Sequence, residues 1–148
     1  MLSPQRRALR AQLSVRGALV QTRSQYVTTI RGLARAAGIL LPKSATASFV
    51  EKVAGSTMDD DLRALIAPLV RTMQVLDTEI EQVEVRLSTM AEQDPTIALC
   101  ATAPGVGLIV AATYVSVIGD AKRFRNAHAV AAYLGLVPGC LLYTSRCV

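Results

Sequence analysis

The chain has 148 residues, of which 51% are hydrophobic and 18% charged, so it can bury a substantial core and wholesale disorder is excluded. Aromatic residues make up only 4% and tryptophan is absent, which argues against a β-sandwich. The net charge of +5 is unevenly distributed: residues 1–52 hold nine basic residues and one acidic residue, residues 53–94 hold three and nine, and residues 95–148 hold four and one. Only part of the chain is therefore expected to face a polyanion.

Residues 1–42 are predicted to form a long basic helix. Ser3 and Pro4 suit the N-cap and the first helical position, and Gly38 followed by Pro42 suits the end. The helix carries basic residues at helical spacing, which are either a solvated face or a ridge that contacts phosphates. Because the segment has a single acidic residue to neutralise them, we favour the phosphate-facing interpretation. The candidate nucleic-acid-binding residues here are Arg16, Arg23, Arg31 and Arg35.

Residues 43–58 are predicted to be a linker or a short irregular helix, and residues 59–94 a helix with a heptad repeat. Pro68 is expected to kink this helix or delay its start. An apolar seam shows packing against a helix but does not identify it: the partner is either the first helix or a second copy of the chain, giving a homo-oligomer through residues 62–90. The seam residues alternate in steps of four and three: Leu62, Ile66, Leu69, Met73, Leu76, Ile80, Val83, Leu87 and Met90.

Residues 95–139 are predicted to form a short helix, a tight turn at Pro104-Gly105-Val106-Gly107 and a second apolar helix. Turns of this kind bind DNA without reading bases, because glycine lets the backbone approach a phosphate and the next helix offers unpaired amides. The alternative is a packed corner between two core helices. We take Gly105, Val106 and Gly107 as candidate nucleic-acid-binding residues. The turn also interrupts the uncharged stretch 95–119, which disfavours a membrane span.

A basic cluster, Lys122, Arg123 and Arg125, follows the second helix and adds three candidate nucleic-acid-binding residues. Asn126 is expected to cap a last helix over residues 127–134. His128, in its first turn, is interpreted as a surface or capping residue.

The cysteines of the chain are Cys100, Cys140 and Cys147. They form no CxxC pair and no zinc spacing with His128, so we expect no metal site and interpret them as reduced thiols of a cytoplasmic protein, with Cys100 buried.

Five blocks in the C-terminal third resemble, in order and spacing, the C-terminal domain of the IS110/IS116 insertion-sequence family of transposases, the DEDD-type enzymes related to pilin-gene invertases. These blocks are Ala103–Gly107, Ala111–Ala112, Ile118–Asp120, Arg123–Phe124 and Ala131–Pro138. Shorter matches to the family's helical region are Leu19–Val20, Thr22–Arg23, Ile30–Leu33, Gly38–Ile39 and Leu41–Pro42. The resemblance covers residues from about 9 to 138.

This resemblance implies DNA as a partner, a structured RNA that chooses sites, and a split active site. In the family, four acids of an N-terminal RuvC-like domain bind a divalent metal, and a serine nucleophile lies in a Ser/Gly-rich turn after the Gly-Leu-Val-Pro block. We expect this chain to be truncated at both ends, with neither part present. Residues 140–148 are an atypical tail, and Ser145 is not assigned as a nucleophile because no glycine follows it. No catalytic residue and no cofactor are therefore predicted in this chain.

The predicted fold is all-α: a long helical or coiled-coil hairpin, followed by a small helix-hairpin-helix-like C-terminal domain. The predicted function is that of a transposase fragment that keeps nucleic-acid-binding and assembly elements and is inactive alone. A non-catalytic helical DNA-binding module is the alternative, and a small membrane-associated protein is a more remote one.

Overall fold

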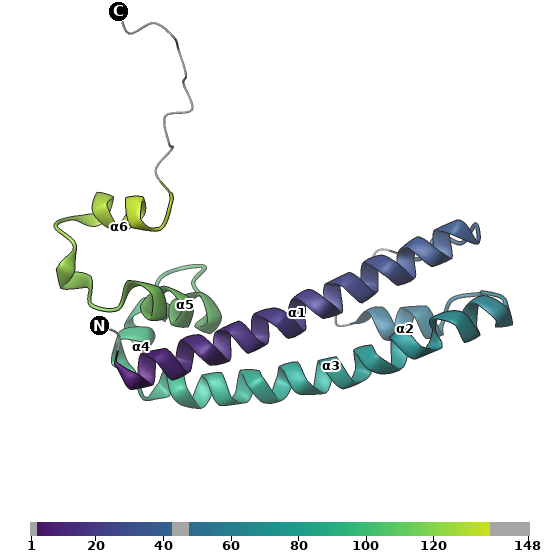
Figure 1. Cartoon of the computed structure of the whole chain (residues 1–148), viewed down its shortest axis with the longest axis horizontal. Coiled ribbons are helices and arrows are strands. Elements are labelled where there is room, and N and C mark those ends of the chain that lie inside the picture. The colour runs from purple at the N-terminus through teal and green to yellow at the C-terminus, as the bar shows by residue number, and fades with distance from the viewer. Residues whose placement is uncertain (1–2, 43–47, 137–148) are drawn as a thin grey trace, which may run out of the picture.

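The computed structural model describes residues 3–42 and 48–136 (Figure 1). Every regular element in these two ranges is helical, which confirms the predicted all-α class. In chain order the helices are α1 (Pro4–Ala36), α2 (Phe49–Ala54), α3 (Asp60–Glu92), α4 (Pro95–Ala101), α5 (Leu108–Ile118), the 3-10 helix η2 (Ala121–Arg123) and α6 (Ala127–Tyr133).

The two long helices, α1 and α3, lie side by side and antiparallel, as Figure 1 shows. The expected signals bound α1: the Ser3 hydroxyl accepts a hydrogen bond from the Arg6 amide at 3.3 Å. At the other end Gly38 takes a φ of 78°, and the Ile39 amide donates to the Ala34 carbonyl at 2.8 Å. This left-handed exit satisfies carbonyls that the helix end would otherwise leave unpaired.

The heptad seam of α3 is buried or half-buried at all nine positions, and α1 is the helix that covers it. Two apolar clusters fill the hairpin. One, around Ile30, Ile66 and Met73, lies toward the α2 end, and the other, around Leu9 and Leu87, lies toward α5. The first of the two alternatives for the seam partner is therefore the one found: an antiparallel hairpin within one chain.

Pro68 lies inside α3, which begins at Asp60, so of the two expected effects, a kink or a delayed start, the delayed start does not occur. Proline removes one backbone donor and leaves the carbonyl four residues earlier, at Ala64, without its helical partner. Both Pro68 and Ala64 are exposed, so water can satisfy that carbonyl. The helix tolerates the residue because it lies on the solvent face and not on the seam.

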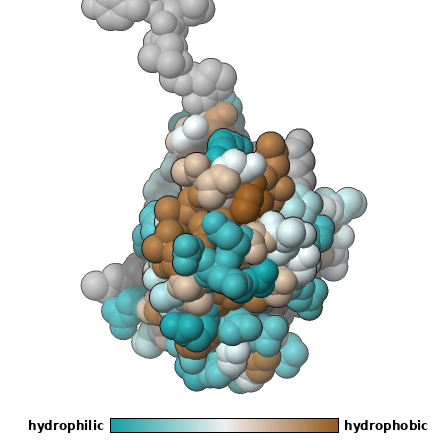
Figure 2. All heavy atoms as spheres, turned by 90° about the vertical axis from the view of Figure 1, so that its right-hand side faces the viewer, coloured by the Kyte–Doolittle hydropathy of each residue, from teal (hydrophilic) through white to brown (hydrophobic). Residues whose placement is uncertain are grey.

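The described part of the segment expected to be a linker contains α2, whose Phe49 and Val53 are buried against the hairpin. Figure 2 shows the hairpin from the end where α1 finishes and α3 begins, and apolar surface lies there among polar atoms. Leu40, beyond α1, is 86% exposed, and Leu65, in the second turn of α3, is 60% exposed.

Helix α5 packs across the other end of the hairpin. Ala111, Ala112 and Val115 are buried there together with Leu9 of α1 and Val83 of α3. Small side chains at positions 111 and 112 allow a close approach of the helices. Among the described residues, no helix is both long and apolar enough to cross a membrane.

Shortening a seam side chain is expected to destabilise the hairpin strongly. Leu87 has no exposed surface, so Leu87→Ala should lower the free energy of unfolding by about 2–5 kcal/mol, measured by urea titration followed by circular dichroism. Val85→Ala is the matched control on the same helix. Val85 is 66% exposed, so the control should change the value by less than about 0.5 kcal/mol. Equal losses in the two variants would contradict the assigned seam.

Candidate nucleic-acid interface

The turn between α4 and α5 is built around two glycines, Gly105 and Gly107. Gly105 takes a φ of 80°, a left-handed conformation that favours glycine, and the Val106 amide donates to the Ala103 carbonyl at 3.1 Å. Gly107 is the N-cap of α5 and supplies no side-chain cap. The first helical bond of α5 runs from the Ala111 amide to the Gly107 carbonyl at 3.0 Å, so the amides of residues 108–110 have no intrahelical partner. Gly105 and Gly107 are exposed and Val106 is half-buried.

The basic cluster follows α5 after a second left-handed glycine, Gly119, with a φ of 68°. The Asp120 carboxylate accepts a hydrogen bond from the Lys122 amide at 2.9 Å and so starts η2. The side chains of Lys122, Arg123 and Arg125 are exposed, and none of them forms an ion pair with a described residue.

Arg123 is held by two aromatic rings. Its guanidinium carbon lies 4.5 Å from the Phe124 ring centroid and 4.7 Å from that of Tyr133 in α6. The two rings meet edge to face, with centroids 5.3 Å apart and planes inclined by 61°. Asn126 caps α6, as predicted, by accepting from the Ala129 amide at 2.9 Å.

Two of the predicted ridge residues contact the other helix of the hairpin. Arg16 forms an ion pair with Glu84 at 2.7 Å, and Arg23 forms one with Asp77 at 2.9 Å. Residues 1–52 hold a single acid, as the sequence indicated, but the acidic partners of these arginines lie outside that segment. The acids come from α3, which packs alongside. Arg16 and Arg23 therefore face a neighbouring helix and form no open ridge.

The other two ridge residues differ from each other. The Arg31 guanidinium lies 5.3 Å from the Phe49 ring centroid, a cation–π contact that joins α1 to α2. Arg35, in the last turn of α1, is exposed and is favourably placed near the negative end of the helix dipole. All four ridge positions are thus distributed along the hairpin, and of the four only Arg35 is exposed.

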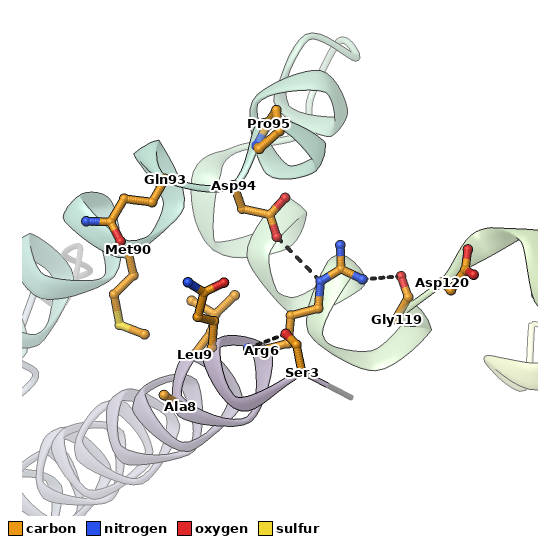
Figure 3. A pocket seen from close by; sticks show the side chains of 11 residues that line it. Ser3, Arg6, Ala8, Leu9, Met90, Gln93, Asp94, Pro95, Gly119 and Asp120 are labelled. Carbon is orange, nitrogen blue, oxygen red and sulfur yellow. Dashed lines mark hydrogen bonds and ion pairs between the residues drawn. The ribbon is translucent and has the colours of Figure 1, made fainter. Parts of the chain in front are cut away.

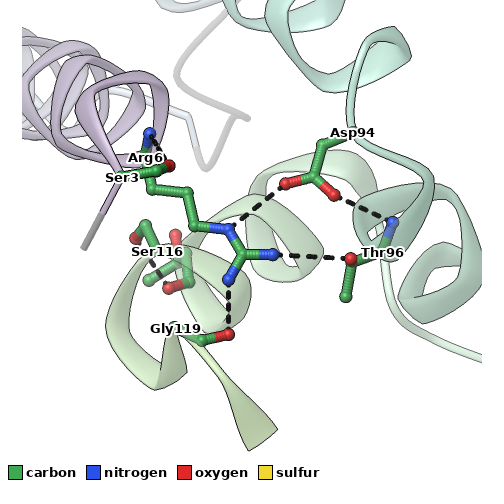
Figure 4. Close-up of polar contacts among 7 residues, drawn as sticks. Ser3, Arg6, Asp94, Thr96, Ser116 and Gly119 are labelled. Atoms are coloured by element: carbon green, nitrogen blue, oxygen red, sulfur yellow. Dashed lines mark hydrogen bonds and ion pairs between the residues drawn. The ribbon is translucent and has the colours of Figure 1, made fainter. Parts of the chain in front are cut away.

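One arginine that the sequence analysis did not single out joins the hairpin to the C-terminal helices. Arg6 of α1 lies 3.5 Å from the Asp94 carboxylate and 3.5 Å from the Thr96 hydroxyl, and it also donates to the Gly119 carbonyl (Figure 4). These partners stand at the α3–α4 corner, in the first turn of α4 and at the end of α5. One side chain therefore ties the start of α4 and the end of α5 to α1.

A hollow of about 560 Å³ lies beside this arginine, lined by residues of α1, α3 and the corner before α4 (Figure 3). Burial of the Asp94 carboxylate tends to raise its pKa and is the largest single influence. The hydrogen bonds from Thr96 and the charge and hydrogen bond of Arg6 together outweigh it, so the pKa of Asp94 lies below its ordinary value of 3.8. The carboxylate remains ionised and holds the Arg6 contact at neutral pH.

The C-terminal third of the chain matches a known protein family. Residues 98–140 match the family described as Transposase IS116/IS110/IS902. The predicted resemblance to the IS110/IS116 transposases is confirmed. The match spans the α4–α5 turn, the basic cluster and α6. No solved structure matches the chain.

Curated relatives extend the similarity over most of the chain. A probable family 20 transposase of Pseudomonas aeruginosa is 29% identical over 146 residues, which cover 92% of this chain and 42% of that protein. The transposase for insertion sequence element IS1111A of Coxiella burnetii is 26% identical, with coverages of 88% and 37%. The transposase for IS1328 of Yersinia enterocolitica is also 26% identical, with coverages of 88% and 40%. The chain thus spans about two-fifths of the length of these transposases.

The described residues do not gather side chains that could ligate a metal ion. Within residues 3–42 and 48–136, no group of three or more His, Cys, Asp or Glu side chains is placed to hold a metal ion. Cys100 is half-buried, where full burial was expected, and His128 is exposed. Cys140, Cys147 and Ser145 lie outside the described residues.

The predicted interface residues are not gathered into one site. The α4–α5 turn and the basic cluster lie at opposite ends of α5, whose 11 residues span about 16 Å. Two further exposed cations, Arg7 and Arg10, were not among the predicted binding residues; they lie in the first two turns of α1 and make no ion pair with a described residue. Their excess over nearby acids was visible in the sequence, but their exposure was not.

The Asp94 contact makes a pH-dependent prediction. Because the pKa of Asp94 is lowered in the folded state, its stabilising contribution is fully present above 3.8 and disappears as the pH falls through the folded value. Asp94→Asn keeps an N-cap residue but loses the charge, so it should lower stability at neutral pH by up to about 1 kcal/mol. Thermal unfolding should show the difference at pH 7, and the difference should shrink as the pH falls below 3.8.

Asp120→Asn provides the control for this substitution. Asp120 is also an N-cap carboxylate, and it forms no ion pair with a described residue. The control should therefore show a smaller change at pH 7. An Asp94→Asn difference that persists unchanged at acid pH would rule out the charge contact as its cause.

Proposed function

We propose that this chain is part of a DNA transposase and supplies a helical hairpin and the start of a C-terminal region that contact nucleic-acid backbone. We further propose that it holds no complete catalytic site of its own. The observation that carries the proposal is the exposed α4–α5 turn, with its unpaired amides, inside the segment that matches the transposase family. The relatives' names support DNA as the partner.

The turn can bind phosphate for three physical reasons. The amides at the start of α5 point outward along the helix axis, where the positive end of the dipole attracts an anion. Gly107 adds no side chain that would hold a phosphate away, and nothing lies within 4 Å of the place where its Cβ would be. Gly105 supplies the reversal between the helices, because its φ of 80° is strained for other residues.

We propose that exposed basic side chains make the remaining contacts with phosphates. Lys122 and Arg125 follow α5, and Arg7 and Arg10 lie in the first two turns of α1, in the part of the hairpin on which α5 packs. Each can neutralise one phosphate and release a condensed counterion. Arg16 and Arg23 instead form ion pairs with Glu84 and Asp77, so the proposed binding residues do not include them.

The proposed absence of strand cleavage rests on the arrangement of carboxylates. Metal-assisted phosphoryl transfer needs clustered acidic ligands. In the described residues, Asp77, Glu84 and Asp94 each pair with an arginine. We propose that chemistry requires parts of a transposase beyond this chain, in keeping with the two-fifths of the relatives' length that it spans.

The α3 seam bears on whether the chain forms a homo-oligomer. The α3 seam is covered by α1 of the same chain, so burying the seam needs no second copy. Any homo-oligomer would therefore form through surfaces that the hairpin leaves open.

Salt dependence separates the two sets of cations. The logarithm of the affinity for duplex DNA should fall linearly with the logarithm of the salt concentration, with a slope of roughly 0.9 per phosphate contact, as measured by fluorescence anisotropy. The double variant Lys122→Ala/Arg125→Ala should flatten this slope by about two units. Arg16→Ala/Arg23→Ala removes the same charge and should leave the slope unchanged while lowering stability. If the second variant flattens the slope as much as the first, the ridge of α1 binds phosphate after all.

Gly107→Ser tests the turn without removing charge. Serine is a good N-cap, so the variant should fold as well as the parent protein or better. Its hydroxyl would accept a hydrogen bond from an amide at the start of α5, and its Cβ would add bulk at the turn. Affinity for duplex DNA should therefore fall roughly ten-fold, as for one lost hydrogen bond to a charged group. Gly17→Ser, in the middle of α1 and also with open space around it, is the control and should bind normally. Unchanged binding by folded Gly107→Ser would show that the turn is a packing corner.

A further inference from the structure

The cluster formed by Arg123, Phe124 and Tyr133 remains largely exposed to solvent. Tyr133 is 53% exposed, Phe124 is half-buried, and no residue of α6 is buried. In Figure 1, α6 projects away from the hairpin. Aromatic side chains contribute to folding mainly by removing their large surface from water. Here much of that surface stays in water beside an exposed cation.

We propose that Arg123 and Tyr133 form a stacking platform for an unpaired base, so that the partner of this region is a single-stranded segment of nucleic acid. This inference rests on the proposed nucleic-acid binding and adds the strand state that the segment recognises. Planar guanidinium and phenol groups are the surfaces on which unpaired bases stack, and every base offers such a face whatever its identity. Base-paired duplex cannot use the platform unless a base leaves the helix.

Three further observations agree with this ligand. The guanidinium is oriented by two rings at 4.5 and 4.7 Å, so little side-chain freedom is lost when a base stacks. Arg123 forms no ion pair with a described residue, so its charge is not neutralised within that part of the chain. Lys122 and Arg125 stand one residue before and two residues after it and can contact the phosphates that flank the stacked base.

The chain lacks tryptophan, which permits a direct test. Tyr133→Trp keeps an aromatic ring in the cluster and introduces a single tryptophan, whose fluorescence a stacked base should quench. Oligothymidylate and oligouridylate should quench it, and a sugar–phosphate strand of the same length without bases should not. Tyr114→Trp is the control: Tyr114 is 37% exposed on α5 and lies outside the cluster, so its fluorescence should change little.

Anisotropy then measures what the ring contributes. Tyr133→Ala should weaken binding of oligothymidylate roughly ten-fold, the effect expected from one lost stacked base, and leave duplex binding unchanged. The loss should persist at high salt, because stacking is not a counterion effect. A difference between the thymidine and uridine strands would report on the 2′-hydroxyl and distinguish DNA from RNA.

The outcomes separate the two proposals. If the parent chain binds duplex but binds strands with and without bases equally, the platform is overturned and backbone binding stands. Equal quenching of the Tyr133→Trp and Tyr114→Trp variants would also overturn the platform. If the parent chain binds no nucleic acid at all, the proposed function and the platform fail together. Tight binding of single strands with quenching at position 133 alone supports both.

Discussion

The contact between the apolar seam of α3 and α1 is the constraint on which the rest of the molecule depends. The described chain buries few other large surfaces: α6 buries none of its residues, and α2 and α4 bury two and one respectively. Helix α5 is held against the hairpin by its apolar face. Ala111 and Ala112 pack in one buried cluster with Leu9 of α1 and Val83 of α3. The orientation of the α4–α5 turn is therefore set by a hairpin that itself carries few of the groups proposed to bind.

The hairpin also decides which charges remain available. A basic segment beside an acidic one can face a polyanion with its basic part, or the two can neutralise each other. The antiparallel packing selects the second outcome along the middle of the hairpin, where Arg16 and Arg23 meet Glu84 and Asp77. These pairs are half-exposed and individually contribute little to stability. Their larger effect is to remove two cations from the surface that a nucleic acid would contact.

Local signals were sufficient to predict the helices and their ends. Ser3, Asn126 and Gly38 act through hydrogen bonds or dihedral angles within a few residues of their own position, and each does in the structure what its residue type suggests. The heptad spacing predicted a buried seam for the same reason. The partners of Arg16, Arg23 and Arg6 could not be predicted in this way, because they lie 68, 54 and 88 or more residues away and depend on the register of one helix against another.

The position of Arg6 shows why register matters to function. Its guanidinium contacts the α3–α4 corner and the carbonyl of Gly119, the residue after α5 at which the chain turns toward the basic cluster. A residue in the first turn of α1 thus fixes the point from which Lys122, Arg123 and Arg125 extend, more than a hundred residues later. This polar contact ties the hairpin to the segment that carries the basic cluster. Because the pKa of Asp94 is lowered by Thr96 and Arg6 against the effect of burial, the tie stays charged across the neutral range. It is polar and partly exposed, so it can be broken at a far smaller energetic cost than the apolar seam that holds the hairpin together.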